Sequence, residues 1–174
     1  DTTVLIEGES GTGKDALAQW LHYQGPRKHA PFVKLDLASL PEELVESELF
    51  GYERGAFTGA EETKLGKFDL AQGGTLVLDE VANVDVRVQA KLLHVVEAKE
   101  FFRLGGTRPI KLDTRIVALS SIPLAKAVER KTFRQDLFFR LNLITVRVPA
   151  LRERRCEMAD IATHLLTLLD RLEN

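Results

Sequence analysis

The sequence predicts an α/β fold with a mainly parallel sheet of five strands. Short apolar runs alternate along the chain with segments of helical periodicity, the order typical of parallel strands joined by helices. A glycine-rich turn at residues 8–13 stands between the first apolar run and the first helical segment. The length of 174 residues is about that of one domain.

The predicted strands are short apolar runs. They cover residues 3–6, 31–37, 75–78, 115–119 and 143–148. The run at 75–78 is continuously apolar, as in strands that are buried on both faces. A further segment, about residues 99–112, holds Gly105, Gly106 and Pro109 and predicts a hairpin.

The predicted helices lie between these strands. They cover residues 14–24, 39–49, 64–71, 86–96, 124–140 with a break near Lys131, and 157–172. One face of the first helix carries Ala16, Leu17, Trp20 and Leu21. The second helix opens with Ser39 and Glu42 at the spacing of a capping box. The last helix has an apolar stripe formed by Ile161, Leu165, Leu168 and Leu172.

The composition is that of an ordinary globular protein. The formal net charge is −2 and the pI about 6.1, so no basic excess indicates that this segment grips nucleic acid by itself. No run approaches the ~18 apolar residues of a membrane span, and no signal peptide is visible. The single cysteine, Cys156, excludes an intrachain disulfide and fits a reducing compartment; we interpret it as a semi-buried, unreactive residue. Because the chain starts without Met and enters a strand almost at once, we expect it to be a piece of a longer protein.

Residues 8–14 match a phosphate-binding loop. They fill the first seven positions of G-x-x-x-x-G-K-[ST] between a predicted strand and a predicted helix, the context that supports the motif. Glycines let successive N–H groups point at phosphate oxygens, the helix N-terminus adds partial positive charge, and Lys14 would reach the β- and γ-phosphates. This context disfavours the alternative, a glycine turn without a ligand. The candidate nucleotide-binding residues are Gly8, Glu9, Ser10, Gly11, Thr12, Gly13, Lys14 and Asp15.

Acidic residues supply candidate metal ligands and a candidate base. Asp15 fills the eighth position of the motif in place of Ser or Thr. A carboxylate there can ligate Mg²⁺ directly or through water, while it adds negative charge beside the phosphates. Asp79 and Glu80 end the strand at 75–78; Asp79 would hold Mg²⁺ and Glu80 would polarise the attacking water. The alternative for this pair is two acids that open a loop.

Two further segments are candidates for contacts outside the chain. Residues 55–60, Gly-Ala-Phe-Thr-Gly-Ala, place Phe57 between glycines in a charged surround, where it is better placed to meet a partner than to join a core. Arg134 and Arg140 could reach a neighbouring subunit's γ-phosphate as arginine fingers. Their spacing alone favours another interpretation, a solvated helix face that pairs with Asp136.

Residues 48–60 resemble the signature of the sigma-54-dependent transcription activators, the bacterial enhancer-binding branch of the AAA+ ATPases. Glu48-Leu49-Phe50-Gly51-Tyr52-Glu53-Arg54 leads directly into the hexapeptide, which is the hallmark of that family. The resemblance covers nearly the whole chain in order. It takes in a Walker A motif at 8–14, a Walker B motif at 73–80, a second insertion hairpin at 101–113, an arginine-finger segment at 133–141 and the start of a lid at 151–154.

The resemblance implies a P-loop NTPase fold of the AAA+ class, a three-layer sandwich truncated at the start of its helical lid. Residues 1–150 would form the nucleotide-binding subdomain, with insertions at about 50–62 and about 99–112, and residues 151–174 the beginning of an incomplete lid. It also implies ATP and Mg²⁺ as cofactors, and self-association into a ring, usually a hexamer. On this resemblance Arg134 and Arg140 both become finger candidates.

The implied function is ATP-driven remodelling of the closed complex of sigma-54 RNA polymerase, in the cytoplasm. Hydrolysis would raise and lower the loop that contacts sigma-54, which consists of Gly55, Ala56, Phe57, Thr58, Gly59 and Ala60. DNA would be bound only through a domain absent from this sequence, and no membrane is involved. Target promoters and the regulatory signal would likewise belong to other domains.

Three positions depart from the pattern of the family. Asp36 replaces an Asn that would donate to Glu80, and Ser120-Ser121 replace a Thr-Asn pair, so Ser121 is the candidate for orienting water. Two carboxylates in contact would raise one pKa or push the side chains apart, and we expect altered coupling between the γ-phosphate and the loop. An alternative function follows, a degenerate nucleotide-sensing module that binds sigma-54 or other partners with little hydrolysis. For the isolated chain we expect weak nucleotide binding, a mostly monomeric state and slow hydrolysis at most.

Overall fold

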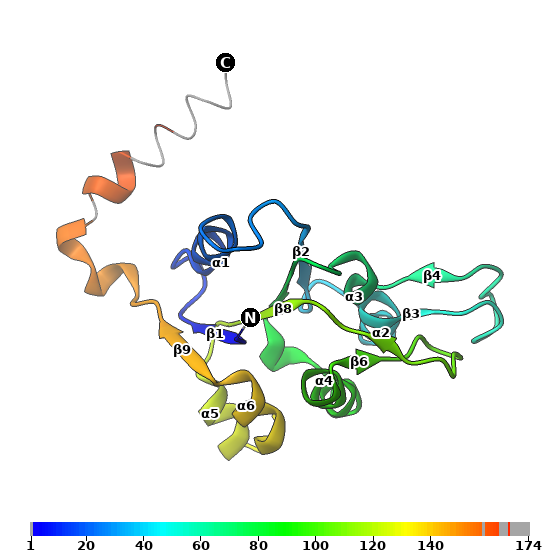
Figure 1. Ribbon diagram of the computed structural model, residues 1–174. Coiled ribbons are helices and arrows are strands. Elements are labelled where there is room, and N and C mark those ends of the chain that lie inside the picture. Colours follow the sequence, from blue (N-terminus) through cyan, green and yellow to red (C-terminus); the bar gives the residue numbers. More distant parts are fainter. Residues whose placement is uncertain (1, 158, 164–166, 168–174) are drawn as a thin grey trace.

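Five parallel strands form the central sheet, as predicted. The computed structural model describes residues 2–157, 159–163 and 167. The strands are ordered β2-β5-β8-β1-β9 and all pair in parallel (Figure 1). Their bounds are β1 (Val4–Glu7), β2 (Phe32–Asp36), β5 (Thr75–Asp79), β8 (Arg115–Ser120) and β9 (Ile144–Arg147).

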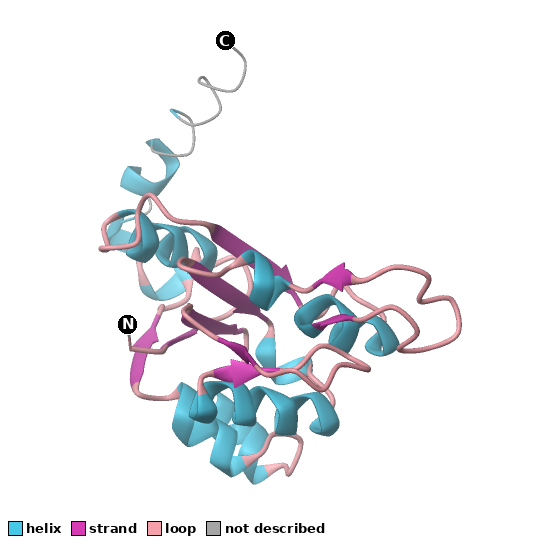
Figure 2. Cartoon of the chain, turned by 45° about the vertical axis from the view of Figure 1, so that its right-hand side comes forward, coloured by secondary structure: helices cyan, strands magenta, loops and turns pink. Residues whose placement is uncertain are grey.

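Helices cover both faces of this sheet (Figure 2). They are α1 (Lys14–Tyr23), α2 (Glu42–Phe50), α3 (Lys67–Leu70), α4 (Val86–Ala98), α5 (Leu124–Glu129) and α6 (Gln135–Leu141), with 3-10 turns η1 (Val81–Asn83), η2 (Leu151–Glu153) and η3 (Arg155–Glu157). The predicted break between α5 and α6 is present, since Lys131 has a φ of 60°. Such a φ is incompatible with a continuing right-handed helix.

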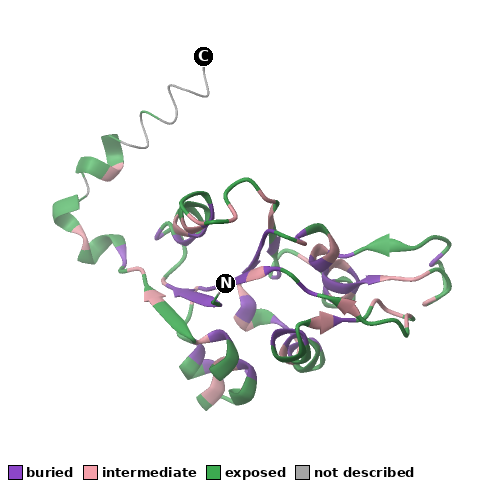
Figure 3. Cartoon of the chain, viewed as in Figure 1, coloured by how far each residue is buried: buried purple, intermediate pink, exposed green. Residues whose placement is uncertain are grey.

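The alternation of side chains along the strands divides the core into two layers. Val4 and Ile6 of β1 pack in one cluster with Ala18 of α1. Leu5, between them, belongs to a larger cluster with residues of α2, α4 and α6, including Leu49, Leu92 and Leu137. The three-layer arrangement therefore follows from central strands that are apolar on both faces. The buried residues concentrate on β1, β5 and β8, whereas the edge strands β2 and β9 are largely exposed or intermediate (Figure 3).

Four local predictions need correction. The predicted face of α1 is only partly correct: Leu17 and Leu21 pack against the core, but Trp20 is 59% exposed, and Ala18 and His22 are the buried positions. The small Ala18 lets the helix lie close to the sheet. The capping box is absent, since Pro41 precedes α2 and the Ser39 hydroxyl donates to the Asp36 carbonyl instead.

The other two corrections concern a helix start and the cysteine. The predicted helix at 64–71 starts later, because Lys64 and Leu65 form the short strand β4 (Lys64–Leu65) before α3. Cys156 is exposed rather than semi-buried, since it lies in η3, a short turn with no buried residue.

Two insertions extend from one side of the sheet (Figure 1). In the first, β3 (Gly51–Tyr52) pairs with β4 in antiparallel orientation. In the second, β6 (Glu100–Phe101) pairs with β7 (Ile110–Lys111) in the same way, which is the predicted hairpin. An isolated bridge between Tyr52 and Leu104 joins the two insertions.

The C-terminal region agrees with the prediction only as far as it is described. Residues 159–163 are helical and belong to the predicted last helix. Leu165, Leu168 and Leu172 of its apolar stripe lie outside the described residues. The division at residue 150 into a core and a lid stays a prediction. In the part of the chain that is described, no helix is long and apolar enough to cross a membrane.

Candidate nucleotide site and partner loop

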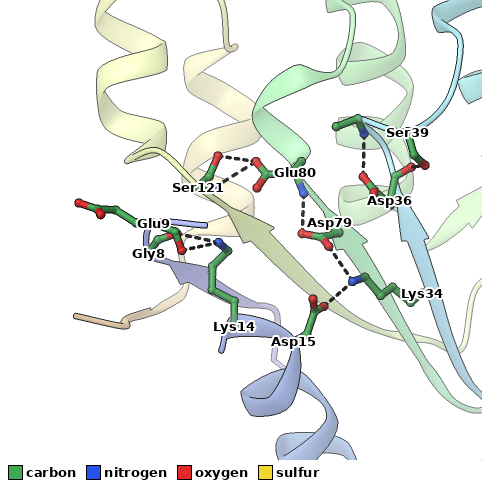
Figure 4. A network of polar contacts seen from close by, with 11 residues as sticks. Gly8, Glu9, Lys14, Asp15, Lys34, Asp36, Ser39, Asp79, Glu80 and Ser121 are labelled. Carbon is green, nitrogen blue, oxygen red and sulfur yellow. Dashed lines mark hydrogen bonds and ion pairs between the residues drawn. The ribbon is translucent and has the colours of Figure 1, made fainter. Parts of the chain in front are cut away.

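The candidate residues for nucleotide chemistry gather at the carboxyl edge of the sheet (Figure 4). The parallel register places Asp36 beside Asp79 and Glu7 beside Ser120. The phosphate loop begins directly after β1, and Glu80 and Ser121 follow β5 and β8. In open α/β sheets this edge is where ligands bind, so the topology assembles the predicted site from four distant segments.

The phosphate loop curls around its own lysine. Gly11 and Gly13 have φ angles of 80° and 92°, a region that L-residues rarely adopt, so glycine is needed at both positions. The Lys14 ammonium is buried and donates to the carbonyls of Gly8 at 2.7 Å and Glu9 at 3.1 Å. Lys14 is thus held at the centre of the loop, from which it can turn toward a phosphate.

The phosphate loop also contacts the C-terminal segment. Both carboxylate oxygens of Glu9 accept hydrogen bonds from the Arg152 guanidinium, at 2.6 and 2.7 Å. Hydrogen bonding from Arg152 lowers the pKa of Glu9. Beside this contact, a cleft of about 890 Å³ opens between Glu9, Ser121 and Glu153, a volume within the range of small-molecule sites.

Asp15 and Asp79 share a cation in the structure. The Lys34 ammonium lies 2.5 Å from Asp15 Oδ1 and 2.8 Å from Asp79 Oδ2 (Figure 4). Burial lowers the pKa of Lys34, but the hydrogen bonds to Asp15 and Asp79 outweigh this effect and raise it overall. The sequence did not single out Lys34, because lysine on an edge strand is usually solvated and nothing local indicates its partners.

The carboxylates of Asp15 and Asp79 converge on one point, since both contact the same ammonium. Among the described residues, no group of three or more His, Cys, Asp or Glu side chains could enclose a metal. Mg²⁺ does not need such a group, since it is commonly held by one or two carboxylates together with phosphate oxygens and water. Asp79 and Asp15 therefore suit Mg²⁺ bound jointly with a nucleotide.

Glu80 is held in an unusual backbone conformation and bonded to Ser121. Its φ of 54° is left-handed, which is uncommon for a residue other than glycine and often marks functional sites. Glu80 Oε2 accepts from the Ser121 hydroxyl at 2.7 Å and from the Ser121 N–H at 3.2 Å. The Asp36 carboxylate instead accepts from the Ala38 N–H at 3.0 Å. Glu80 and Asp36, for which the sequence analysis considered a direct contact, thus have separate partners.

Both candidate arginines have acidic partners within the chain. Arg134 makes two hydrogen bonds to Asp136, and Arg140 donates to Glu97 at 2.7 Å. The hydrogen bond from Arg134 lowers the pKa of Asp136. The structure therefore contains the pairing with Asp136 that spacing alone favoured.

A buried glutamine anchors this segment and was missed at the level of sequence. Gln89 of α4 is fully buried, and its amide nitrogen donates to the carbonyls of Val84 and Thr132. Its amide oxygen accepts from the Arg134 N–H at 2.8 Å. A polar residue at a buried helix position is a usable signal, because it needs partners.

The hexapeptide loop presents Phe57 at its tip. Phe57 is 49% exposed and packs edge-on against Tyr52, with ring centroids 4.9 Å apart. The loop is closed by a hydrogen bond from the Gly55 N–H to the Ala60 carbonyl at 2.8 Å. The Phe57 ring thus packs on Tyr52 on one side and is exposed to solvent on the other, as the sequence suggested.

Arg103 ties the two insertions together, and we name it with its partners Glu53 and Asp69 the stem cluster. Its guanidinium lies 2.7 Å from Asp69 Oδ1 and 2.9 Å from Glu53 Oε1. These hydrogen bonds, chiefly those to Asp69, raise its pKa further above the ordinary value. Gly105 approaches Ala56 so closely that a Cβ there would lie 2.8 Å from the Ala56 Cα. No local pattern in the sequence indicated this cluster.

Comparison with known proteins assigns the chain to a family. Residues 1–147 match the family model described as Sigma-54 interaction domain. The Nif-specific regulatory protein of Azospirillum brasilense is 50% identical over 165 residues, which cover 95% of this chain and 26% of that protein. NtrC of Escherichia coli is 48% identical over 169 residues, 97% of this chain and 36% of that protein. The chain thus spans about a quarter to about a third of the length of these relatives.

Solved structures give the same result. A crystal structure of NtrX from Brucella abortus in complex with ATP is similar with a TM-score of 0.88 and 36% identity, over 97% of this chain and 36% of that one. The P-loop NTPase domain of a sigma-54 transport activator from E. coli shares the fold, with a TM-score of 0.55 at 19% identity. The chain therefore belongs to the sigma-54 interaction domain family, on the P-loop NTPase fold of the AAA+ class.

Proposed function

We propose that this chain binds ATP with Mg²⁺ and hydrolyses it to ADP and phosphate. Lys14 contacts the β- and γ-phosphates, and Asp79 with Asp15 holds the metal, which neutralises charge on the phosphates. Glu80 accepts a proton from water as the water oxygen bonds to the γ-phosphorus and the bond to the β–γ bridging oxygen breaks. The observation that carries the proposal is the Glu80 carboxylate, fixed by Ser121 at the strand end beside Asp79. The similar NtrX structure in complex with ATP supports it.

Hydrolysis serves to move the hexapeptide loop against sigma-54 in the RNA polymerase closed complex. Phe57 is the contact residue, since it is the exposed aromatic at the loop tip. The chain acts in a ring, in which Arg134 or Arg140 leaves its acidic partner and reaches the nucleotide of the adjacent subunit. An arginine so placed stabilises charge in the transition state.

A second candidate function is a nucleotide-sensing module with little hydrolysis. It is favoured by the Lys34 ammonium, which lies between the two carboxylates assigned to the metal. In this case the protein binds ATP and sigma-54 but turns over slowly.

Phosphate release by the full-length protein separates the two candidates. Glu80→Gln keeps the shape of the side chain but cannot take the proton, so release should fall by about 100-fold or more while ATP still binds. Phe57→Ala should leave phosphate release in place and abolish promoter activation. If the wild type binds ATP and releases no more phosphate than Glu80→Gln, the sensing module is the correct function.

A further inference from the structure

Lys34 connects the two carboxylates assigned to the metal. It stands in the middle of β2, in register with Val77 of β5. From there its ammonium reaches Asp15 at the start of α1 and Asp79 at the end of β5 (Figure 4). Its side chain is 36% exposed, whereas that of Asp79 is 13% exposed. The contact therefore joins groups from three separate elements at the phosphate edge.

We propose that Lys34 is an internal counter-ion that takes the place of Mg²⁺ between Asp15 and Asp79, and that the metal binds only when Lys34 leaves. The inference rests on the metal site of the proposed function. A metal bound to both carboxylates would lie about 2 Å from their oxygens. The ammonium occupies the same space at 2.5 and 2.8 Å from those oxygens, and two cations there would repel each other.

This arrangement makes metal binding depend on the nucleotide. Without phosphates, Mg²⁺ would have to displace the Lys34 ammonium and would gain only the two carboxylates as protein ligands. With ATP bound, phosphate oxygens supply further ligands to the metal and an anionic partner to the displaced ammonium. Lys34 also neutralises the charge of Asp15, so the acidic residue in the eighth position of the motif does not leave an uncompensated repulsion.

Binding of Mn²⁺ to the whole chain without nucleotide tests the inference. The signal of free Mn²⁺ in electron paramagnetic resonance gives the affinity directly and does not depend on turnover. Lys34→Met has a similar length without charge and should bind Mn²⁺ about tenfold more tightly than the wild type, because no cation competes. Lys34→Arg keeps the charge and should stay as weak as the wild type.

Two further measurements keep the result decisive. Lys34→Gln, which is neutral but can still donate a hydrogen bond, should show the same tightening even where Lys34→Met folds poorly. Equal or weaker Mn²⁺ binding by the folded neutral variants would overturn the inference. A parallel titration with a non-hydrolysable ATP analogue tests the metal site itself. If neither the wild type nor any variant binds Mn²⁺ there, the proposed metal ligands are wrong and the inference fails with them.

Discussion

The phosphate edge and the two insertions use charged side chains in opposite ways. At the phosphate edge, Lys14 is bonded to carbonyls of its own loop, and Lys34 to carboxylates that would receive a metal. On the proposed function, each of these contacts is exchanged when the nucleotide and its metal bind. In the insertions, Arg103 joins Asp69 and Glu53, and no proposed ligand replaces any of the three.

The difference indicates which part of the molecule rearranges and which part moves as a unit. A contact that a proposed ligand replaces opposes the binding of that ligand, because the contact must be broken first. Contacts of the stem cluster persist, so they hold the base of the Phe57 loop against the hairpin. Substitutions at the phosphate edge should therefore change binding and turnover, and substitutions in the stem cluster should change stability.

The largest effect on stability is expected for Arg103→Met. Asp69, whose side chain is 10% exposed, would lose its cationic partner. The free energy of unfolding should fall by about 3 kcal/mol, because a largely buried carboxylate keeps the hydrogen bond from the Gly66 N–H but loses its countercharge. Urea unfolding measures the loss. Arg108→Met, at an exposed position of the same hairpin, is the control and should cost less than about 0.5 kcal/mol. Equal losses in the free energy of unfolding for the two variants would show that the stem cluster has no special role in stability.

The contact between the hairpin and the loop can be isolated with a matched pair of glycines. Gly105 and Gly73 have φ angles of 71° and 74°, but only at Gly105 would a Cβ meet Ala56. Gly73→Ala should cost about 1 kcal/mol from backbone strain alone, and Gly105→Ala about 2 kcal/mol because the loop must also shift. Gly105→Ala in the full-length protein should also weaken promoter activation. Identical losses of stability would show that the approach of the two insertions is unimportant.

At the phosphate edge, Ser121→Ala tests whether a contact affects turnover without affecting the fold. Glu80 would lose its hydroxyl donor, so phosphate release should fall by about tenfold because the base is less well positioned. The free energy of unfolding should change by less than about 0.5 kcal/mol. Ser121→Thr retains the hydroxyl and should restore release. A loss of stability as large as that of Arg103→Met would contradict the comparison.

The smallest effect concerns pH and the helix that follows the phosphate loop. His22 is buried, accepts or donates a hydrogen bond to Thr75 Oγ1 at 2.9 Å, and has a lowered pKa, chiefly because of burial. As pH falls below about 6.5, the histidine binds a proton in the unfolded chain before it does so in the folded chain. The contribution of His22 to the free energy of unfolding is therefore fully present above that pH and is lost on acidification. The loss should not exceed about 1.4 kcal/mol per pH unit.

Urea unfolding of the wild type and His22→Gln across this pH range measures the contribution of His22. The wild type should lose more stability than the variant on acidification. If the free energies of unfolding of the two proteins change in parallel with pH, groups other than His22 cause the acid sensitivity.

Much of the fold and of the phosphate site could be predicted because the signals are local. The apolar runs of β1 and β5, the glycines before Lys14 and the two acids at the end of β5 each lie within a few residues of one another. The buried face of α1 could be predicted only in part, since Leu17 and Leu21 pack against the core as expected. The apolar periodicity favoured Trp20, but close packing on the sheet selected Ala18 and His22.

The sequence by itself determined the α/β class, the five strands, the glycine-rich loop and the exposed Phe57 of the hexapeptide, because period and motif spacing are properties of neighbouring residues. Only the tertiary structure decided which charges meet. Glu80 finds Ser121 across 41 positions, and Arg103 finds Asp69 and Glu53 across 34 and 50. Lys34 reaches Asp15 and Asp79 only because α1, β2 and β5 converge at one edge. Pairing between residues far apart in the sequence depends on how the elements pack, and no local sequence pattern indicates which residues will meet.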